Sequence, residues 1–318
     1  MRSVLKWLGA LSLAVLLSSC GSSDDDLGNV AEVAQRNGFT ALLAAVDKAG
    51  LASTLTAANA DLTVLAPTDA AFGALATQLG FTNAGAMVAA LPAADLGKIL
   101  RYHVLPGARS SAALGTAGAT LPTAYVFDGA AVRLTLNTSS GVAFTDAVLA
   151  RASVTTANMY ADNGIIHGID KVLIPPGVLN VVQMAQTNPA SFSALVGAVV
   201  ATGLAPALSG SGPFTVFAPN NTAFASAPTG LTTSQLTTVL TYHVLPAQVL
   251  SGAIPFGTPV ATLATTALDG STVAAQTITI NRNLTITDTT AVPATILATD
   301  VRASNGVIHV IGKVLIPR

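Results

Sequence analysis

The sequence predicts an α+β protein that consists of two copies of one domain, each built on a sheet sandwich. Two observations support this fold class. Blocks of sequence recur in the same order, 140 to 153 residues apart, and within each copy helical spacing comes before strand alternation. The chain has 318 residues, which is enough for about two domains.

The duplication rests on four blocks, at 39–55 and 192–208, 63–72 and 215–224, 102–106 and 242–246, and 163–176 and 305–318. The two copies agree at 9 of 17, 6 of 10, 5 of 5 and 10 of 14 positions. Their separation falls from 153 and 152 to 140 and 142 residues, so the first copy is expected to carry an extra segment near 81–94. We expect the first domain at 29–176 and the second at 177–318.

Helices are expected in the first half of each copy. In the opening block, apolar residues recur at helical spacing, with Gly50 near the end of the block (Leu42, Leu43, Val46 and Leu51). The strand "TVLAP" is followed by Thr68, whose hydroxyl can cap a helix, and Asn220 takes its place in the second copy.

Strands are expected in the second half. "AVRLTLN" (131–137) alternates apolar and polar residues, as do the stretches 277–280 and 284–288. In the last block an Asn-Gly turn leads into an apolar strand closed by proline. Alternation places Ile165, His167 and Ile169 on one face of this strand and Ile166 on the other, which indicates a central strand.

The four histidines of the chain form two matched pairs, His103 with His243 and His167 with His309. The first pair follows a tyrosine in each copy, Tyr102 and Tyr242. A histidine in a central strand is most simply neutral, buried and hydrogen-bonded through its ring nitrogens. We therefore interpret all six residues as structural.

A catalytic or metal site is the alternative interpretation, and the sequence disfavours it. Two histidines are too few for a zinc site, which usually has three or four protein ligands. The acidic residues of the second copy match no acidic residue of the first (Asp269, Asp288 and Asp300). Nucleophile-elbow, zinc-protease, P-loop and dinucleotide motifs are absent from the sequence. We expect no catalytic residue, no metal and no cofactor.

Residues 1–19 are expected to be a lipoprotein signal peptide. Two basic residues precede an apolar stretch from Trp7 to Leu17, and "LSSC" then ends in Cys20, the only cysteine. This resembles the lipobox of bacterial lipoproteins, which are cut before the cysteine and acylated on it, for example with palmitate. Residues 20–28 would form a flexible tether. An ordinary secretory signal with an incidental cysteine is the alternative.

Charge limits the choice of partners. Two of the 14 basic residues lie in the signal peptide, so 12 basic against 15 acidic residues remain, a net charge of −3. A weakly acidic chain without a basic cluster is not expected to bind nucleic acid. The second domain has seven charged residues among residues 178–318, which suits a surface that packs against a partner. Compositional drift explains the same count, and both interpretations stay open.

"TVLAPTDAAF", "YHVLPG" and "NGIIHGIDKVLIP" resemble the motifs of fasciclin domains in order and spacing, and both copies carry them. The resemblance implies two tandem fasciclin-like domains, each a β-sandwich wedge with several helices. It also implies an extracytoplasmic, often lipid-anchored protein associated with adhesion rather than catalysis. Its Tyr-His motif implies a role for Tyr102–His103 and Tyr242–His243 in core packing and adhesion. Gly312 departs from the family, which often has Asp there, as at Asp170.

These observations together predict a non-enzymatic lipoprotein of the cell envelope, at the outer membrane or cell surface. Acylated Cys20 would bind the membrane, and the domains would bind a surface protein, a polysaccharide or another copy of the chain. The alternative is a periplasmic structural or stress-related lipoprotein with no adhesive role.

Overall fold

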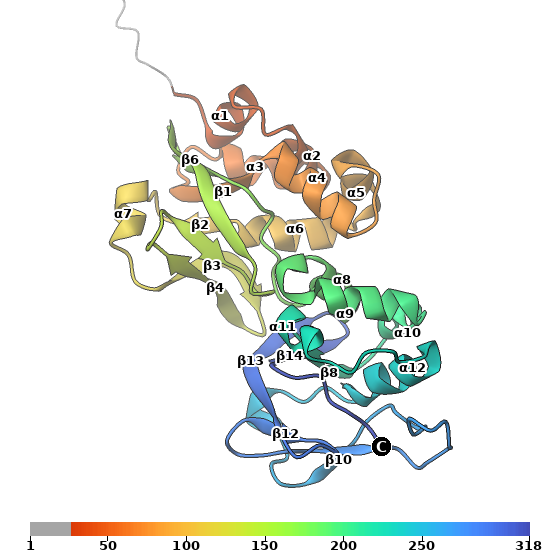
Figure 1. Cartoon of the computed structure of the whole chain (residues 1–318). Coiled ribbons are helices and arrows are strands. Elements are labelled where there is room, and N and C mark those ends of the chain that lie inside the picture. Colours follow the sequence, from red (N-terminus) through yellow and green to blue (C-terminus); the bar gives the residue numbers. More distant parts are fainter. Residues whose placement is uncertain (1–26) are drawn as a thin grey trace, which may run out of the picture.

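A computed structural model describes residues 27–318, and Figure 1 shows them as two units stacked end to end. We call residues 27–176 domain 1 and residues 177–318 domain 2. The signal peptide predicted at 1–19, Cys20 and most of the tether lie outside the described residues.

Domain 1 places most of its helices before most of its strands. The helices are α1 (Val30–Arg36), α2 (Thr40–Lys48), α3 (Ala52–Thr56), α4 (Asp69–Gln78), α5 (Ala84–Ala90), α6 (Ala93–Tyr102) and α7 (Ser111–Gly115). The strands are β1 (Leu62–Pro67), β2 (Val104–Pro106), β3 (Thr120–Phe127), β4 (Ala130–Asn137), β5 (Ala143–Thr145), β6 (Arg151–Ala161) and β7 (Gly164–Ile169).

Domain 2 repeats this order. Its helices are α8 (Val181–Gln186), α9 (Pro189–Ala201), α10 (Ala205–Leu208), α11 (Asn221–Ala225), α12 (Thr233–Tyr242) and the 3-10 turn η1 (Ser251–Ala253). Its strands are β8 (Phe214–Pro219), β9 (Val244–Leu245), β10 (Pro259–Ala261), β11 (Thr277–Ile280), β12 (Thr285–Thr287), β13 (Ala294–Ala303) and β14 (Gly306–Ile311).

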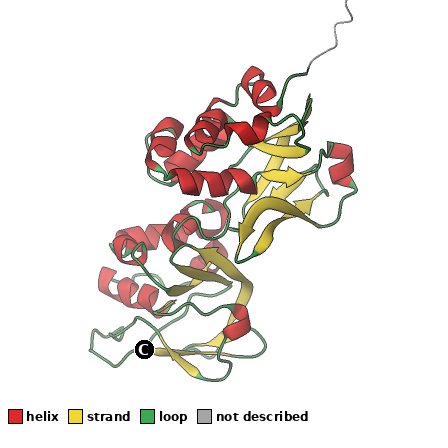
Figure 2. Cartoon of the chain, turned by 180° about the vertical axis from the view of Figure 1, so that it is seen from behind, coloured by secondary structure: helices red, strands yellow, loops and turns green. Residues whose placement is uncertain are grey.

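Each domain contains one seven-stranded sheet, in the order β2-β1-β7-β6-β5-β4-β3 and β10-β11-β12-β13-β14-β8-β9. The edge strands β2 and β3 contact one another, so the sheet of domain 1 curls on itself. Most of the helices gather on one side of the strands, and α7 lies apart from them on the other side (Figure 2). The α+β class is confirmed, and the two layers expected of a sandwich are halves of one curled sheet.

The last strand of each copy is central, as predicted. β7 lies between β1, to which it is parallel, and β6, to which it is antiparallel. All six of its residues are buried, and the same holds for β14. Both strands end at isoleucine, six residues before the proline expected to close them (Pro175 and Pro317).

The helix caps and the extra segment of domain 1 are also confirmed. The Thr68 and Asn220 side chains accept hydrogen bonds from the third residue beyond them, at the starts of α4 and α11. α5 fills the segment near 81–94 and buries Met87 and Val88 against α2 and α4. Domain 2 has no helix between α11 and α12, and an apolar hollow of about 260 Å³ lies beside these helices instead.

The domains meet through a buried, apolar junction. The Asn188 Nδ2 of domain 2 donates a buried hydrogen bond of 2.9 Å to the Val148 carbonyl of domain 1. The Arg302 guanidinium lies 3.0 Å from the Asp128 carboxylate and 5.2 Å from the centroid of the Phe127 ring. One continuous cluster of buried apolar side chains runs through both domains. The junction therefore packs the two domains directly against each other.

Candidate functional site

His103 and His243 clamp the end of a helix to the segment that follows the last strand. Each is the C-cap residue of its helix, α6 or α12. The His103 Nδ1 bonds to the Ile99 carbonyl at 2.8 Å, and its Nε2 accepts from the Leu173 amide at 2.9 Å. His243 repeats both bonds, with the Val239 carbonyl at 2.7 Å and the Leu315 amide at 2.9 Å. The Tyr-His motif is thus joined to the last motif of its own domain.

His167 and His309 hold a loop against the central strand. Their Nε2 atoms bond to the carbonyls of Arg109 and Val249, at 2.8 and 2.9 Å. Their Nδ1 atoms accept at 3.3 Å from the amides of Asn158 and Asp300, which have left-handed φ angles of 60° and 61° in the irregular middle of β6 and β13. These bonds fix the bulge in each long strand.

All four rings are buried and neutral. Burial lowers the pKa of His103 and of His243 to about 4, and it also lowers the pKa of His167 and of His309. In each ring one nitrogen donates and the other accepts, so no nitrogen lone pair remains for a metal. Among residues 27–318, no three His, Cys, Asp or Glu side chains lie close enough to share an ion.

The two tyrosines are buried beside the histidines. Tyr102 packs edge-on against Tyr125 with 6.3 Å between ring centroids, and burial raises the pKa of its hydroxyl. The Tyr242 hydroxyl donates to the Thr277 carbonyl at 2.9 Å, and burial raises its pKa to about 12. Both tyrosines therefore stay protonated and act in packing.

One carboxylate lies near each Tyr-His motif, and the two match, contrary to the expectation that the acidic residues of the second copy match none of the first. Asp146 and Asp288 each accept a hydrogen bond of 2.9 Å from the amide of the last-block isoleucine, Ile174 or Ile316. The separation of 142 residues, already known from the last block, could have identified the pair. Sequence comparison missed it because the residues around each aspartate differ.

The two carboxylates differ in their hydrogen-bond donors. Asp146 is fully buried and accepts only backbone amides, from Val148, Ala150 and Ile174. Burial raises its pKa to about 7. Burial acts in the same direction on Asp288, but hydrogen bonds from Thr290, from Ile316 and from Lys313 at 3.0 Å together lower its pKa.

The departure at Gly312 also has a structural consequence. Asp170 Oδ1 accepts a 2.7 Å hydrogen bond from the Ser153 amide, beside the backbone bond from the Asp170 amide to the Ser153 carbonyl. In domain 2 only the backbone bond remains, from the Gly312 amide to the Thr295 carbonyl. The Leu297 side chain lies over Gly312 instead and is 55% exposed.

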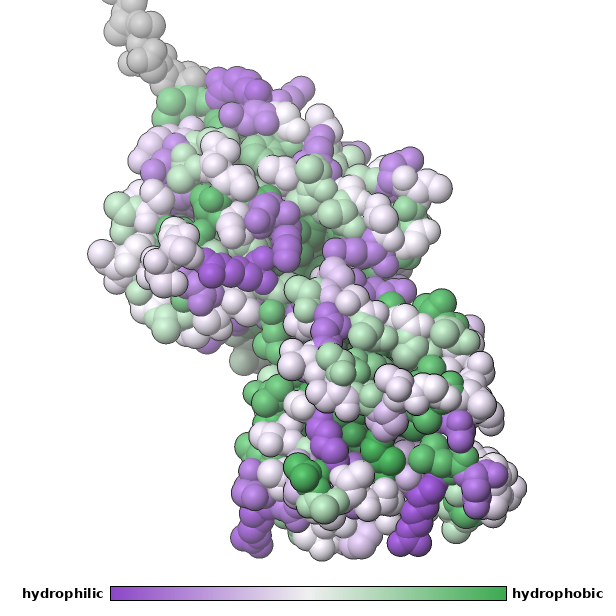
Figure 3. All heavy atoms as spheres, in the orientation of Figure 1, coloured by the Kyte–Doolittle hydropathy of each residue, from purple (hydrophilic) through white to green (hydrophobic). Residues whose placement is uncertain are grey.

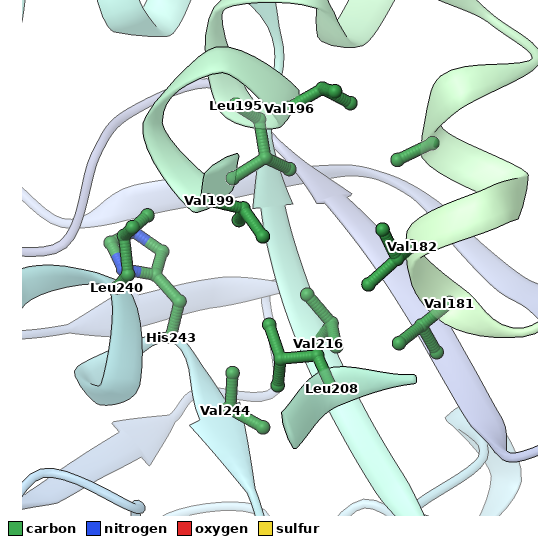
Figure 4. A pocket seen from close by; sticks show the side chains of 11 residues that line it. Val181, Val182, Leu195, Val196, Val199, Leu208, Val216, Leu240, His243 and Val244 are labelled. Carbon is green, nitrogen blue, oxygen red and sulfur yellow. The ribbon is translucent and has the colours of Figure 1, made fainter. Parts of the chain in front are cut away.

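A small apolar cavity borders each helix-end histidine. In domain 2 its volume is about 40 Å³, and Figure 4 shows His243 at its edge, facing side chains such as Val199, Val216 and Val244. The matching cavity beside His103 measures about 110 Å³. Because both nitrogens of each ring are already bonded, the cavities present mainly carbon to their interior.

The arrangement of these residues supports packing rather than chemistry. The histidines have no free nitrogen, and each lies inside a hydrogen-bonded clamp. None of the helices within residues 27–318 has the length and apolar character needed to span a bilayer.

The comparisons with known proteins agree with this fold. The Fasciclin domain model matches residues 37–175 and 190–317. Protein sll1483 of Synechocystis is 41% identical over 152 residues, which cover 44% of this chain and 74% of that protein. Uncharacterized protein sll1735 of Synechocystis is 35% identical over 144 residues, covering 43% and 97%.

Among solved structures, the FAS1 domain pair of the insect cell adhesion molecule Fasciclin I is similar with a TM-score of 0.42 and 17% identity, over 89% of this chain and 94% of that one. The family model alone matches most of the sequence, once in each domain, and its two matches include all four histidines. The chain belongs to the fasciclin domain family.

Proposed function

We propose that this protein is a non-enzymatic adhesion protein of the cell envelope, anchored by a lipid on Cys20, whose two domains bind a partner at the surface. Fasciclin domains are found in cell-adhesion proteins and are generally non-catalytic. The observation that carries the proposal is that every histidine of the chain is buried in a structural clamp, which leaves the outer surface to act.

The surface of domain 2 supports a binding role. Its seven charged residues leave large parts of it uncharged, and Figure 3 shows hydrophilic side chains scattered among apolar groups there. In domain 1, hydrophilic side chains gather around α1 (Figure 3). Few charges remove much of the repulsion that normally keeps surfaces apart. We therefore assign the partner contact to domain 2, with a surface protein, a polysaccharide or another copy as the partner.

The lipid anchor is tested by Cys20→Ser. We expect the wild-type chain to sediment with membranes and to carry labelled palmitate, and the variant to lose the label completely. The matched control is Ser22→Ala, which changes a neighbouring residue and should keep the label. A Cys20→Ser chain that still incorporates palmitate would contradict anchoring at this residue.

The adhesive role is tested with beads coated with residues 27–318, which contain both complete sheets. We expect the beads to bind intact cells or one another, and beads coated with albumin to stay dispersed. Protease treatment of intact cells should remove the protein from the outer surface. Dispersed beads together with protection from protease would instead favour the inward-facing structural lipoprotein.

A further inference from the structure

The junction between the domains joins two different surfaces. Domain 1 contributes its tail surface, formed by the β3–β4 turn and by the loop that follows β5 (Phe127, Asp128 and Val148). Domain 2 contributes its head surface, formed by the end of α8 and by β13 (Thr187, Asn188 and Arg302). An interface between unlike surfaces is heterologous and can be repeated.

Because the domain is duplicated, each surface exists a second time. The tail surface of domain 2 has Thr290 at the position of Val148, 142 residues later, and Val292 at the position of Ala150. The turn Asp128–Gly129 recurs as Asp269–Gly270, again with a left-handed glycine. The head surface of domain 1 is the end of α1 together with β6 (Arg36, Asn37 and Tyr160). Tyr160 precedes Arg302 by 142 residues and holds the same register in its strand.

The centre of the engaged junction is buried, whereas Asp128 at its rim is exposed and the duplicate surfaces are on the whole more open. In the junction, Asn188 is 3% exposed and Val148 is 1% exposed. At the free ends, Arg36 and Asn37 are exposed and Tyr160 is 53% exposed. On the tail surface of domain 2, Val292 is 67% exposed, whereas its counterpart Ala150 is buried. Among residues 27–318, Asn37, Tyr160 and Val292 therefore lack the cover that their counterparts have.

We propose that a second copy of this chain covers them, with the tail surface of domain 2 in one molecule packed on the head surface of domain 1 in the next. Repeating the junction in this way lines the molecules up head to tail, because the two domains already stack end to end (Figure 1). The inference rests on the proposed function, since the second copy supplies the surface partner.

The chemistry of the free surfaces fits this contact. Asp269 is exposed on domain 2 at the position that corresponds to Asp128, and Arg36 supplies a cation on the head surface of domain 1. The aromatic group changes sides, from Phe127 on the engaged tail to Tyr160 on the free head. The acceptor for Asn188 is a backbone carbonyl, so the change from Val148 to Thr290 keeps it.

The free contact is expected to be weak in solution. Inside the chain the short linker holds the two surfaces at an effective concentration on the order of millimolar, an advantage that separate molecules lack. Anchoring many copies on one membrane would restore part of this advantage. Association should therefore rise steeply with concentration.

The experiment is sedimentation velocity on residues 27–318 over a wide concentration range, with three variants. Asn37→Arg blocks the head surface and Val292→Arg, at a residue that is 67% exposed, blocks the tail surface. Val200→Arg is the control, because Val200 is 60% exposed near the end of α9, outside both surfaces. We expect the wild type and the control to form dimers and longer species, and each blocked variant to stay monomeric.

An equimolar mixture of the two blocked variants gives the decisive result. Each retains the surface that the other lacks, so we expect dimers that do not extend further. A wild type that stays monomeric throughout would overturn the inference, and so would a blocked variant that associates like the wild type. Beads that bind cells despite a monomeric wild type would keep the proposed function and reject only this contact. Assembly in solution without any bead adhesion would keep this contact and reject the proposed adhesive function.

Discussion

Replacing either helix-end histidine with alanine is expected to destabilise its own domain by about 3 to 5 kcal/mol. The His103 and His243 rings are each 2% exposed and satisfy one buried carbonyl and one buried amide. His103→Ala and His243→Ala would each leave a cavity and would leave one backbone carbonyl and one backbone amide without a hydrogen bond. Calorimetry should show the melting temperature of one transition falling by roughly 10 °C.

Conservative and surface substitutions provide the controls. Glutamine at either histidine position retains a donor and an acceptor, so it should lose clearly less stability than alanine. Val126→Ala in domain 1 and Val200→Ala in domain 2 change residues that are 59% and 60% exposed, and they should melt like the parent. Alanine variants at both histidines that also melted like the parent would refute the clamp.

Mild acid is expected to unfold domain 2 before domain 1. The pKa of His103 and of His243 is about 4, below the ordinary 6.5, so the unfolded chain takes up these protons first. Each domain therefore loses stability as the pH falls from 6.5 towards 4, by about 3 kcal/mol per histidine. This loss is common to both domains, and the carboxylates Asp146 and Asp288 make the acid sensitivity of the two domains differ.

Asp146 and Asp288 act in opposite directions. The pKa of Asp146 is raised to about 7, so folded domain 1 binds a proton early and gains stability as the pH falls from 7 towards 3.8. The pKa of Asp288 is lowered, so domain 2 loses stability as the pH falls from 3.8 through the folded value. Between pH 7 and 4, protonation of Asp146 therefore offsets part of the stability that domain 1 loses through its histidine, and domain 2 has no such offset.

Calorimetric scans between about pH 7 and 5 should resolve the two domains, with the transition of domain 2 moving down faster. Asp146→Asn imitates the protonated carboxyl and should remove the compensation, so that domain 1 becomes as acid-sensitive as domain 2. Asp288→Asn is the matched variant, and it should lower stability at neutral pH by breaking the contact with Lys313. Transitions that shift in parallel in the wild type would contradict this account.

Much of the fold could be predicted because the chain repeats itself. The duplication, the strand alternation around His167 and the cap at Thr68 each depend on local patterns, and the structure contains all three. The partners of the histidines could not be predicted in the same way. His103 bonds to the amide of Leu173, which lies 70 residues away, and a backbone amide leaves no mark on the sequence.

The contacts between the two domains could not be predicted from the sequence either. Asn188 binds a backbone carbonyl, and Arg302 meets Asp128 only because the two domains stack end to end. Their counterparts Asn37 and Tyr160 have similar local sequence positions but are exposed, so burial here is a property of the assembled pair. The matched carboxylates Asp146 and Asp288 can be predicted from the sequence, because the 142-residue separation of the last block also relates these two residues.

The position of the last strand also governs when a domain can close during synthesis. β7 lies in the middle of its sheet, and it pairs Gly164 with Leu62, 102 residues earlier. Until these final residues emerge, β1 has an open edge that could pair with another chain. Contacts at such separation form slowly. Each domain therefore stays unfinished until nearly all of it has been made.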